Sequence, residues 1–220
     1  MTGRAGTRAE EREELRRLLS ERGRTYAEEA GITLRDKPQP LYRLLVLADL
    51  LSAPIRAEAA VDSARELSGA GMRSCRAMTE ASWQERVDAL GRGGYRRYDE
   101  STATRLGEAA DLLLDAYGGD LRRLRERADG DADALRELLR EIPGLGPTGV
   151  EIFLREVQAV WPEAGPLLDG KALDGARRAG LPGDADRLLA AAPRGTEPAR
   201  LAAALVRTAL APRERGKRAA

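Results

Sequence analysis

The sequence predicts an all-α fold, and three observations support this prediction. Alanine, leucine, arginine and glutamate are abundant, whereas valine and isoleucine are few and the 220 residues include a single phenylalanine. This composition favours helix over sheet. Apolar residues recur at the spacing of one helix face, as in Leu135, Leu138 and Leu139. Glycine and proline interrupt these patterns repeatedly, and no segment predicts a strand.

The helical patterns and the residues that interrupt them place the expected helices, in order, at 9–23, 25–30, 41–53, 54–67, 77–90, 102–117, 121–127, 132–141, 147–160, 171–179, 185–191 and 198–210. The segment 41–53 is the most apolar, so we expect it at the centre of the fold. The proline-containing segment 37–40 indicates a break between subdomains, and Pro54 is expected to open the next helix. Ser101 or Thr102 is expected to cap the helix that ends at residue 117.

Composition excludes several kinds of site. The chain has no histidine, which excludes catalysis and metal binding by imidazole. Its single cysteine, Cys75, excludes an internal disulfide and cannot supply the four thiolates of a four-iron cluster. The sequence has no apolar run of membrane-spanning length and no apolar signal core at its N-terminus. We therefore expect a cytoplasmic protein without a membrane segment.

Charge is balanced overall but uneven along the chain. The formal net charge of +1 gives no general attraction to nucleic acid. Seven basic residues gather toward the C-terminus: Arg194, Arg200, Arg207, Arg213, Arg215, Lys217 and Arg218. This segment is either a local phosphate-binding region or a solvated tail.

The segment Ile142 to Val150, IPGLGPTGV, predicts a tight hairpin between two helices. A Pro–Gly pair at 143–144 ends the first helix, and Pro147 is suited to the first position of the second. The first N–H groups of a helix have no partner within it, and Gly144 and Gly146 carry no side chain that would obstruct them. A phosphate can therefore approach the backbone at this point.

The hairpin resembles that of the helix-hairpin-helix (HhH-GPD) DNA glycosylases, and two further segments match the same family in the same order. Leu168-Asp169-Gly170 follows the hairpin at the distance of the family's catalytic Asp loop, and it is similar to the adenine glycosylase branch. Upstream, Leu50 to Ala53 (LLSA) resembles a segment of endonuclease III. Gly94-Tyr95 resembles the segment that precedes a long helix in both the endonuclease III and the adenine glycosylase branches. The resemblance covers roughly residues 40 to 182.

The resemblance implies an all-α fold with two lobes. One lobe would be a helical barrel at 40–160 that includes the helix-hairpin-helix at about 134–158. Residues 1–39 and 161–220 would form the other lobe, which carries the Asp loop, and the cleft between the lobes would hold the active site. The implied activity is that of a monomeric, nucleoid-associated DNA-repair glycosylase. It would flip a damaged or mispaired base out of double-stranded DNA and hydrolyse the N-glycosidic bond.

The family's catalytic carboxylate corresponds to Asp169. A carboxylate near the sugar stabilises the positive charge that develops as the N-glycosidic bond breaks. The simpler interpretation is an N-cap for the following helix, and one Asp can serve both purposes. Asp49 lies in an apolar helix near the position of a catalytic Glu in the adenine glycosylases, with the register one residue off. It either protonates a leaving base or is buried against an arginine.

The resemblance also implies a set of DNA contacts. The expected DNA-binding residues are Gly144, Leu145, Gly146, Thr148, Gly149 and Lys171. The expected base-pocket or strand-contact residues are Pro54, Tyr95, Arg97 and Tyr98. Pro54 replaces the Gln with which endonuclease III fills the gap left by the flipped nucleotide. For Tyr95, Arg97 and Tyr98, stacking on a base and packing in the core are equally compatible with the sequence.

Two departures from the family concern the reaction and its cofactors. Bifunctional members have a nucleophilic Lys at the position of Thr148, so the resemblance implies a monofunctional enzyme that uses water. A bifunctional lyase acting through Lys171, and a binding module without activity, remain the alternatives. With one cysteine we expect no iron–sulfur cluster and no other metal cofactor, while an alkali cation at the hairpin carbonyls is compatible with the sequence.

Overall fold

The computed structural model describes residues 3–212, with side chains from residue 8 onward, and every regular element in this part of the chain is a helix. The chain divides into two compact units. One unit is continuous, Thr25–Pro166, and the other combines Met1–Arg24 with Leu167–Ala220. The all-α prediction is confirmed. Of the basic residues near the C-terminus, Arg213, Arg215, Lys217 and Arg218 lie outside the described residues.

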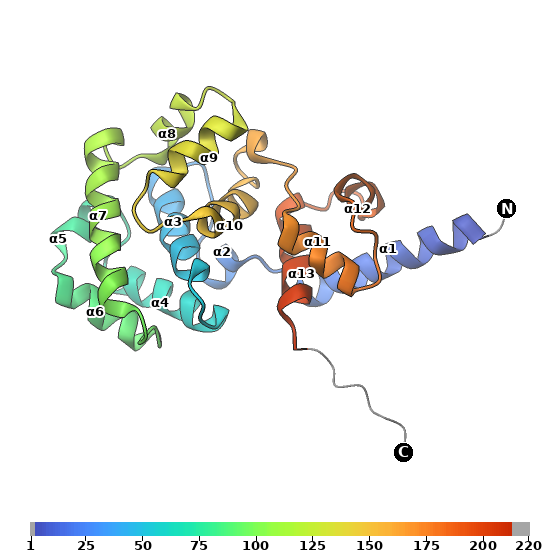
Figure 1. Ribbon diagram of the computed structural model, residues 1–220, viewed down its shortest axis with the longest axis horizontal. Coiled ribbons are helices and arrows are strands. Elements are labelled where there is room, and N and C mark those ends of the chain that lie inside the picture. Colours follow the sequence, from blue (N-terminus) through green and yellow to red (C-terminus); the bar gives the residue numbers. More distant parts are fainter. Residues whose placement is uncertain (1–2, 213–220) are drawn as a thin grey trace, which may run out of the picture. The chain divides into compact units, whose positions relative to one another are not determined.

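The continuous unit contains the helices α2 (Tyr26–Glu29), α3 (Pro38–Ser52), α4 (Ala57–Gly69), α5 (Cys75–Glu80), α6 (Trp83–Arg92), α7 (Asp99–Tyr117), α8 (Leu121–Arg127), α9 (Ala132–Arg140) and α10 (Pro147–Val157), followed by the 3₁₀ turn Pro162–Ala164. Helix α3 is its central element and packs against α4, α8 and α10 (Figure 1). Most of its residues from Leu41 to Leu50 are buried, as its apolar sequence predicts.

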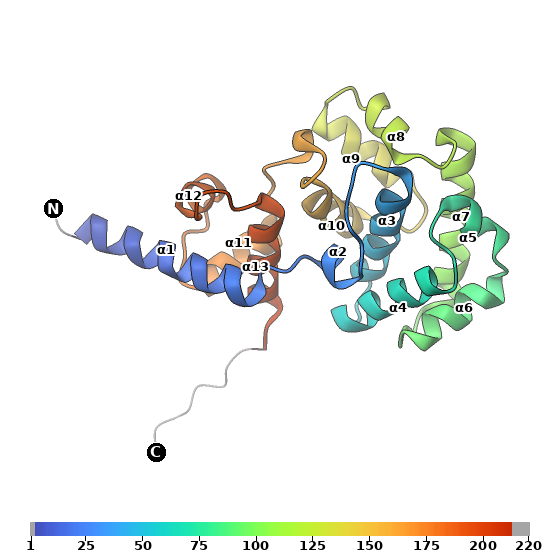
Figure 2. The ribbon, with the colours of Figure 1, turned by 180° about the vertical axis from the view of Figure 1, so that it is seen from behind.

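The other unit contains α1 (Gly3–Arg22), α11 (Gly170–Arg178), α12 (Ala185–Ala191) and α13 (Pro198–Leu210). Helix α13 packs against both α1 and α11 (Figure 2). On α11, the small residues Ala172, Gly175 and Ala176 form the buried face. A Cβ at Gly175 would collide with the backbone carbonyl of Leu205, so the two helix backbones approach closely only because this residue is glycine. This contact fixes the helix that begins after Asp169.

Several helix boundaries differ from the sequence-based expectations, and four of the differences have a clear local reason. Helix α3 begins at Pro38, inside the segment 37–40 that was expected to be a break before the helix. A proline fits the first turn of a helix, because its missing N–H would have no partner there. Pro54 lies in the loop before α4, which starts at Ala57. The expected helix at 77–90 is two helices, because Ser82 forms a capping box that starts α6. Neither Ser101 nor Thr102 caps α7, which begins at Asp99 with Tyr98 as its N-cap.

Residues 25–39 and 161–166 belong to the continuous unit, whereas the resemblance implied that they belong to the other lobe. Polar contacts explain this difference. The buried Glu156 carboxylate accepts hydrogen bonds from the backbone N–H groups of Tyr26 (3.2 Å) and Ala27 (2.9 Å). It thereby attaches α2 to α10.

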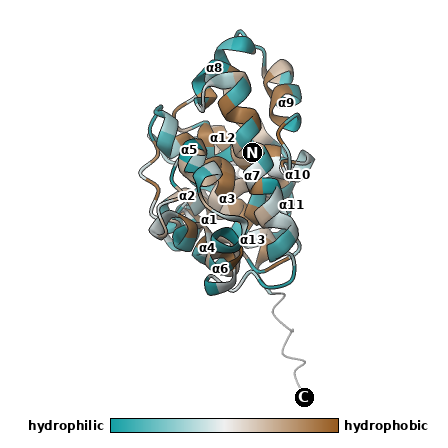
Figure 3. Ribbon diagram, turned by 90° about the vertical axis from the view of Figure 1, so that its left-hand side faces the viewer, coloured by the Kyte–Doolittle hydropathy of each residue, from teal (hydrophilic) through white to brown (hydrophobic). Residues whose placement is uncertain are grey.

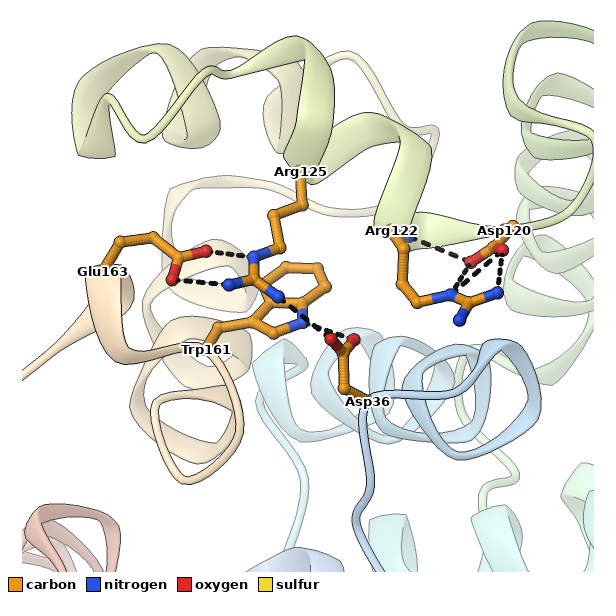
Figure 4. A network of polar contacts seen from close by, with 6 residues as sticks. All are labelled: Asp36, Asp120, Arg122, Arg125, Trp161 and Glu163. Carbon is orange, nitrogen blue, oxygen red and sulfur yellow. Dashed lines mark hydrogen bonds and ion pairs between the residues drawn. The ribbon is translucent and has the colours of Figure 1, made fainter.

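A second group of contacts holds both ends of this unit to α8 (Figure 4). The Arg125 guanidinium makes a two-pronged ion pair with Glu163 and a 3.0 Å contact with Asp36. It also lies 5.4 Å from the ring centroid of the buried Trp161, whose indole N–H donates to Asp36 at 2.9 Å. Nearby, Asp120 caps α8 and pairs with Arg122 at 2.6 Å. The network joins three segments that are distant in sequence.

Many of the helices carry both polar and apolar stretches, as α8 and α9 show in Figure 3. Helix α9 buries Leu135 and Leu139 on one face. Within the described residues, none of the helices is both long enough and apolar enough to cross a membrane.

Candidate nucleic-acid interface and catalytic carboxylate

The hairpin between α9 and α10 is held from within by its own backbone. The N–H of Leu145 donates to the Ile142 carbonyl at 3.0 Å, and the N–H of Gly146 donates to the Gly144 carbonyl at 3.0 Å. The side chains of Ile142 and Leu145 are buried and anchor the turn in the core. Gly144 has φ = +88°, a conformation that an L side chain rarely adopts.

The N-terminus of α10 is exposed and has no side-chain cap. Its N-cap is Gly146, with φ −68° and ψ 179°, and Pro147 occupies the first helical position. Residues 146–148 are exposed, and space around the Gly146 Cα is open. In the first turn of an α-helix the N–H groups have no partner four residues back. Thr148 and Gly149 supply those N–H groups here, so the helix end attracts an anion.

The expected hairpin contacts divide into an exposed and a buried group. Gly146 and Thr148 are exposed, whereas Leu145 and Gly149 are buried. A Cβ at Gly149 would lie 2.9 Å from Leu145 Cδ1 and 3.6 Å from Ser52 Cβ on α3. Gly149 is therefore required for the packing of α10, and the buried side chain of Leu145 supports the hairpin from below.

Asp49 lies directly beneath the hairpin. The residue is only 6% exposed, and its Oδ1 atom is buried without a hydrogen-bond partner among the described residues. A Cβ built on Gly144 would lie 2.9 Å from that oxygen and 3.3 Å from Arg105 Nε. Gly144 is thus glycine for two reasons, its positive φ and the close approach of the Asp49 and Arg105 side chains.

Burial raises the pKa of Asp49 to about 7, and the Arg105 guanidinium on α7 opposes this shift. The carboxylate also borders a crevice of about 10 Å³, at the lower limit for a single water molecule. Bulk water therefore does not hydrate the ionised carboxylate fully. Of the two interpretations of Asp49, this geometry favours burial beside an arginine over contact with a leaving base.

Sequence reasoning missed Arg105. Its guanidinium donates to Thr102 Oγ1 at 3.0 Å, and the hydroxyl of Thr102 contacts the Tyr95 hydroxyl at 3.4 Å. Thr102 is fully buried on the inward face of α7, and a residue three positions later lies on the same face. That spacing was the only signal in the sequence, because the approach of Asp49 depends on tertiary packing.

The expected base-pocket residues do not share one environment. Tyr95 is 1% exposed, and burial raises the pKa of its phenol. It is therefore a core residue. Arg97 is exposed, and its guanidinium carbon lies 5.3 Å from the ring centroid of the partly exposed Tyr98. This pair is therefore accessible to a nucleic-acid strand. Pro54 is exposed in the loop after α3.

Asp169 is the N-cap of α11. Its Oδ1 atom accepts a hydrogen bond from the Ala172 N–H at 2.8 Å, and the residue is partly exposed. Leu168, which precedes it, is buried. Lys171 is exposed in the first turn of the same helix. The structure thus confirms that Asp169 is a helix cap, and the cap holds its carboxylate in one orientation.

Comparison with solved structures identifies the fold. The crystal structure of the H. pylori 3-methyladenine DNA glycosylase MagIII, bound to 1,N6-ethenoadenine, superposes with a TM-score of 0.54. The match has 15% sequence identity and covers 91% of this chain and 95% of that one. The chain has the helix-hairpin-helix glycosylase fold. No family model and no curated protein matches the sequence.

This fold was predicted from the hairpin and the spaced Asp, and the structural match confirms it. The helix-hairpin-helix glycosylase fold here contains both elements that the resemblance implied, the exposed N-terminus of α10 and the carboxylate at the N-terminus of α11. Within residues 3–212, no group of three or more Cys, Asp and Glu side chains is arranged to hold a metal ion.

Proposed function

We propose that this protein is a DNA N-glycosylase that acts in base-excision repair. Its substrate would be double-stranded DNA with a damaged or mispaired base, which it flips out and releases by hydrolysis. The observation that carries the proposal is the partly exposed carboxylate of Asp169, held at a helix N-terminus in a chain with the helix-hairpin-helix glycosylase fold.

The hairpin is suited to hold the DNA backbone. The uncapped N–H groups at the start of α10 and the positive end of its helix dipole both attract a phosphate. These are contacts with the backbone alone, so they position the duplex without reading its sequence. The exposed Arg97 and Tyr98 add a cation and an aromatic face that can contact a strand.

Asp169 would act on the sugar. As the bond from C1′ to the base nitrogen breaks, its electron pair leaves with the base and positive charge develops on the sugar. The fixed carboxylate stabilises that charge. A water oxygen then bonds to C1′ and releases a proton, while the departing base gains one. We assign this chemistry to Asp169 and not to Asp49, because the Asp49 carboxyl is buried against the hairpin.

Water is the proposed nucleophile because Thr148 stands at the position of the Lys in bifunctional relatives, and a hydroxyl forms no imine. The specific rival is a lyase reaction through Lys171, which is exposed two residues after Asp169. Borohydride reduction on a duplex with an abasic site separates the two. We expect no covalent adduct, whereas an adduct abolished by Lys171→Arg would establish the lyase.

The direct test of the function is base release from a panel of lesion and mismatch duplexes. We expect single-turnover release from at least one duplex, with loss of activity in Asp169→Asn. Duplex binding without release from any member would support the alternative of an inactive binding module. We also expect no iron in the purified protein, since one cysteine cannot hold a cluster. Stoichiometric iron by elemental analysis would contradict this expectation.

A further inference from the structure

The Asp49 carboxyl is a buried ionisable group, with the residue only 6% exposed. Its Oδ1 atom is buried and has no hydrogen-bond partner among the described residues. This oxygen lies against Gly144 of the hairpin. Because Gly144 has no Cβ, both Asp49 Oδ1 and Arg105 Nε can approach its backbone closely. No ion pair within 4.0 Å joins Asp49 and Arg105, although both lie against the same glycine.

The groups that face Asp49 come from three elements. Arg105 faces it from α7, the Tyr95 phenol interacts with both residues from the preceding loop, and Tyr42 on α3 lines the same crevice. The hairpin residues 142–146 contain no titratable side chain. The phenols are neutral near pH 7, so only Arg105 is charged there and it compensates the ionised carboxylate incompletely.

The hairpin is also where a phosphate is expected. The uncapped N-terminus of α10 begins two residues after Gly144. Arg105, whose Nε atom approaches Gly144, is partly exposed. A bound phosphate and an ionised Asp49 would repel each other through a poorly hydrated region. Protonation of Asp49 removes that repulsion and leaves the guanidinium of Arg105 available to the phosphate.

We propose that Asp49 and Arg105 form a proton-linked charge pair beneath the hairpin, so that DNA binding is accompanied by proton uptake at Asp49. Arg105 is a positioning residue in this pair, because it sets the charge state of Asp49. The inference rests on the proposed binding of DNA at the hairpin. It assigns Asp49 to affinity and not to the bond-breaking step, and it predicts that affinity for any duplex falls as pH rises through neutrality.

The first measurement uses the unaltered protein and an undamaged duplex oligonucleotide. Calorimetry near pH 7 in buffers of different ionisation enthalpy should show uptake of a fraction of a proton for each duplex bound. Fluorescence anisotropy at constant salt should show an affinity about tenfold lower at pH 8.5 than at pH 6, the scale of one charge interaction near a protein surface. Absence of proton uptake would overturn the inference.

The second measurement compares variants. Asp49→Asn should bind tightly at all pH values and lose most of the pH dependence. Arg105→Gln removes the charge that lowers the pKa of Asp49, so the fall in affinity should move to higher pH. Asp115→Asn, an exposed carboxylate on the same helix as Arg105, is the matched control and should behave as the wild type does.

The outcomes separate this inference from the proposed function. Unchanged pH dependence in Asp49→Asn, or an unmoved midpoint in Arg105→Gln, would overturn the charge pair while leaving DNA binding intact. Binding by the wild type that does not depend on pH would also overturn the charge pair and leave DNA binding intact. Failure of the wild type to bind any duplex at any pH would overturn the charge pair and the proposed function together.

Discussion

The N-termini of α10 and α11 have nearly the same backbone and opposite chemistry. The N-cap of α10 is Gly146, with φ −68° and ψ 179°, and that of α11 is Asp169, with φ −68° and ψ 174°. At α10 the N-cap has no side chain, so the first N–H groups of the helix have no side-chain cap. At α11 a carboxylate accepts the Ala172 N–H and brings a negative charge. The same local geometry is therefore suited to a phosphate in one place and to a developing cation in the other.

This comparison shows that the helix end itself does not determine function. In each case the N-cap residue decides which charge the helix end can receive. Removing the charge at Asp169 and introducing one at Gly146 therefore test whether the N-cap residue determines the role of each helix end.

The largest expected effect is at α11. Asp169→Asn keeps a capping side chain but removes the negative charge. Base release should fall by about a hundredfold or more, the scale of losing one well-placed electrostatic group. Thermal stability and duplex affinity should change little. Lost stability with retained base release would reduce Asp169 to a structural cap.

The next effect concerns Asp49, which lies beneath the hairpin, and the pH dependence of stability that it causes. Because burial raises the pKa of Asp49 from 3.8 to about 7, the protonated form is favoured in the folded state. The stability that comes from protonated Asp49 is fully present below about pH 4 and is lost as pH rises through 7, a loss on the order of 4 kcal/mol at most. Asp49→Asn should therefore be more stable than the wild type at pH 8 and similar at pH 4. Chemical denaturation at both pH values measures this, and an equal difference at both would contradict it.

A smaller effect distinguishes the two hairpin glycines. Gly144→Ala places a side chain at φ +88° and against Asp49 Oδ1, and it should cost about 1–3 kcal/mol of unfolding free energy. Gly146→Ala meets no atom within 4 Å at an ordinary φ, so a change within about 0.5 kcal/mol is expected. Equal destabilisation of the two variants in urea would show that the hairpin is not packed on Asp49.

The smallest effect is the reciprocal exchange at α10. Gly146→Asp supplies the cap that this helix lacks, so stability should stay the same or rise by a few tenths of a kcal/mol. The new carboxylate occupies the anion position, and affinity for any duplex should fall about tenfold. Gly146→Ala is the neutral control. Affinity that is unchanged in Gly146→Asp would remove the α10 N-terminus from the DNA interface.

Sequence patterns predicted the elements whose boundaries depend on local chemistry. Pro147 marks the start of α10, and the bounds of α12 and α13 were predicted to the residue. The hairpin and the position of Asp169 were also predictable, because both follow from turn residues and spacing. The split between α5 and α6 was missed because Ser82 and Glu85 form a capping box inside a continuous apolar pattern.

Tertiary contacts were not predictable in this way. Nothing local to Asp49 indicates that its carboxyl lies against Gly144, about a hundred residues later, or that Arg105 approaches the same point. The attachment of residues 25–36 to the continuous unit likewise depends on Glu156 and on the Arg125 network. A single sequence records which residues are unusual, whereas packing decides which of them meet.

Asp169 and Gly146 occupy equivalent helix ends, and we propose different tasks for them, one in the reaction and one in binding. Single-turnover base release at saturating protein tests this proposal most directly, on a duplex that the wild type processes. We expect a rate lower by about a hundredfold or more in Asp169→Asn and by no more than severalfold in Gly146→Asp. The smaller effect in Gly146→Asp is expected because saturating protein compensates for its weaker binding to the duplex. A rate in Asp169→Asn close to that of the wild type would contradict the proposal.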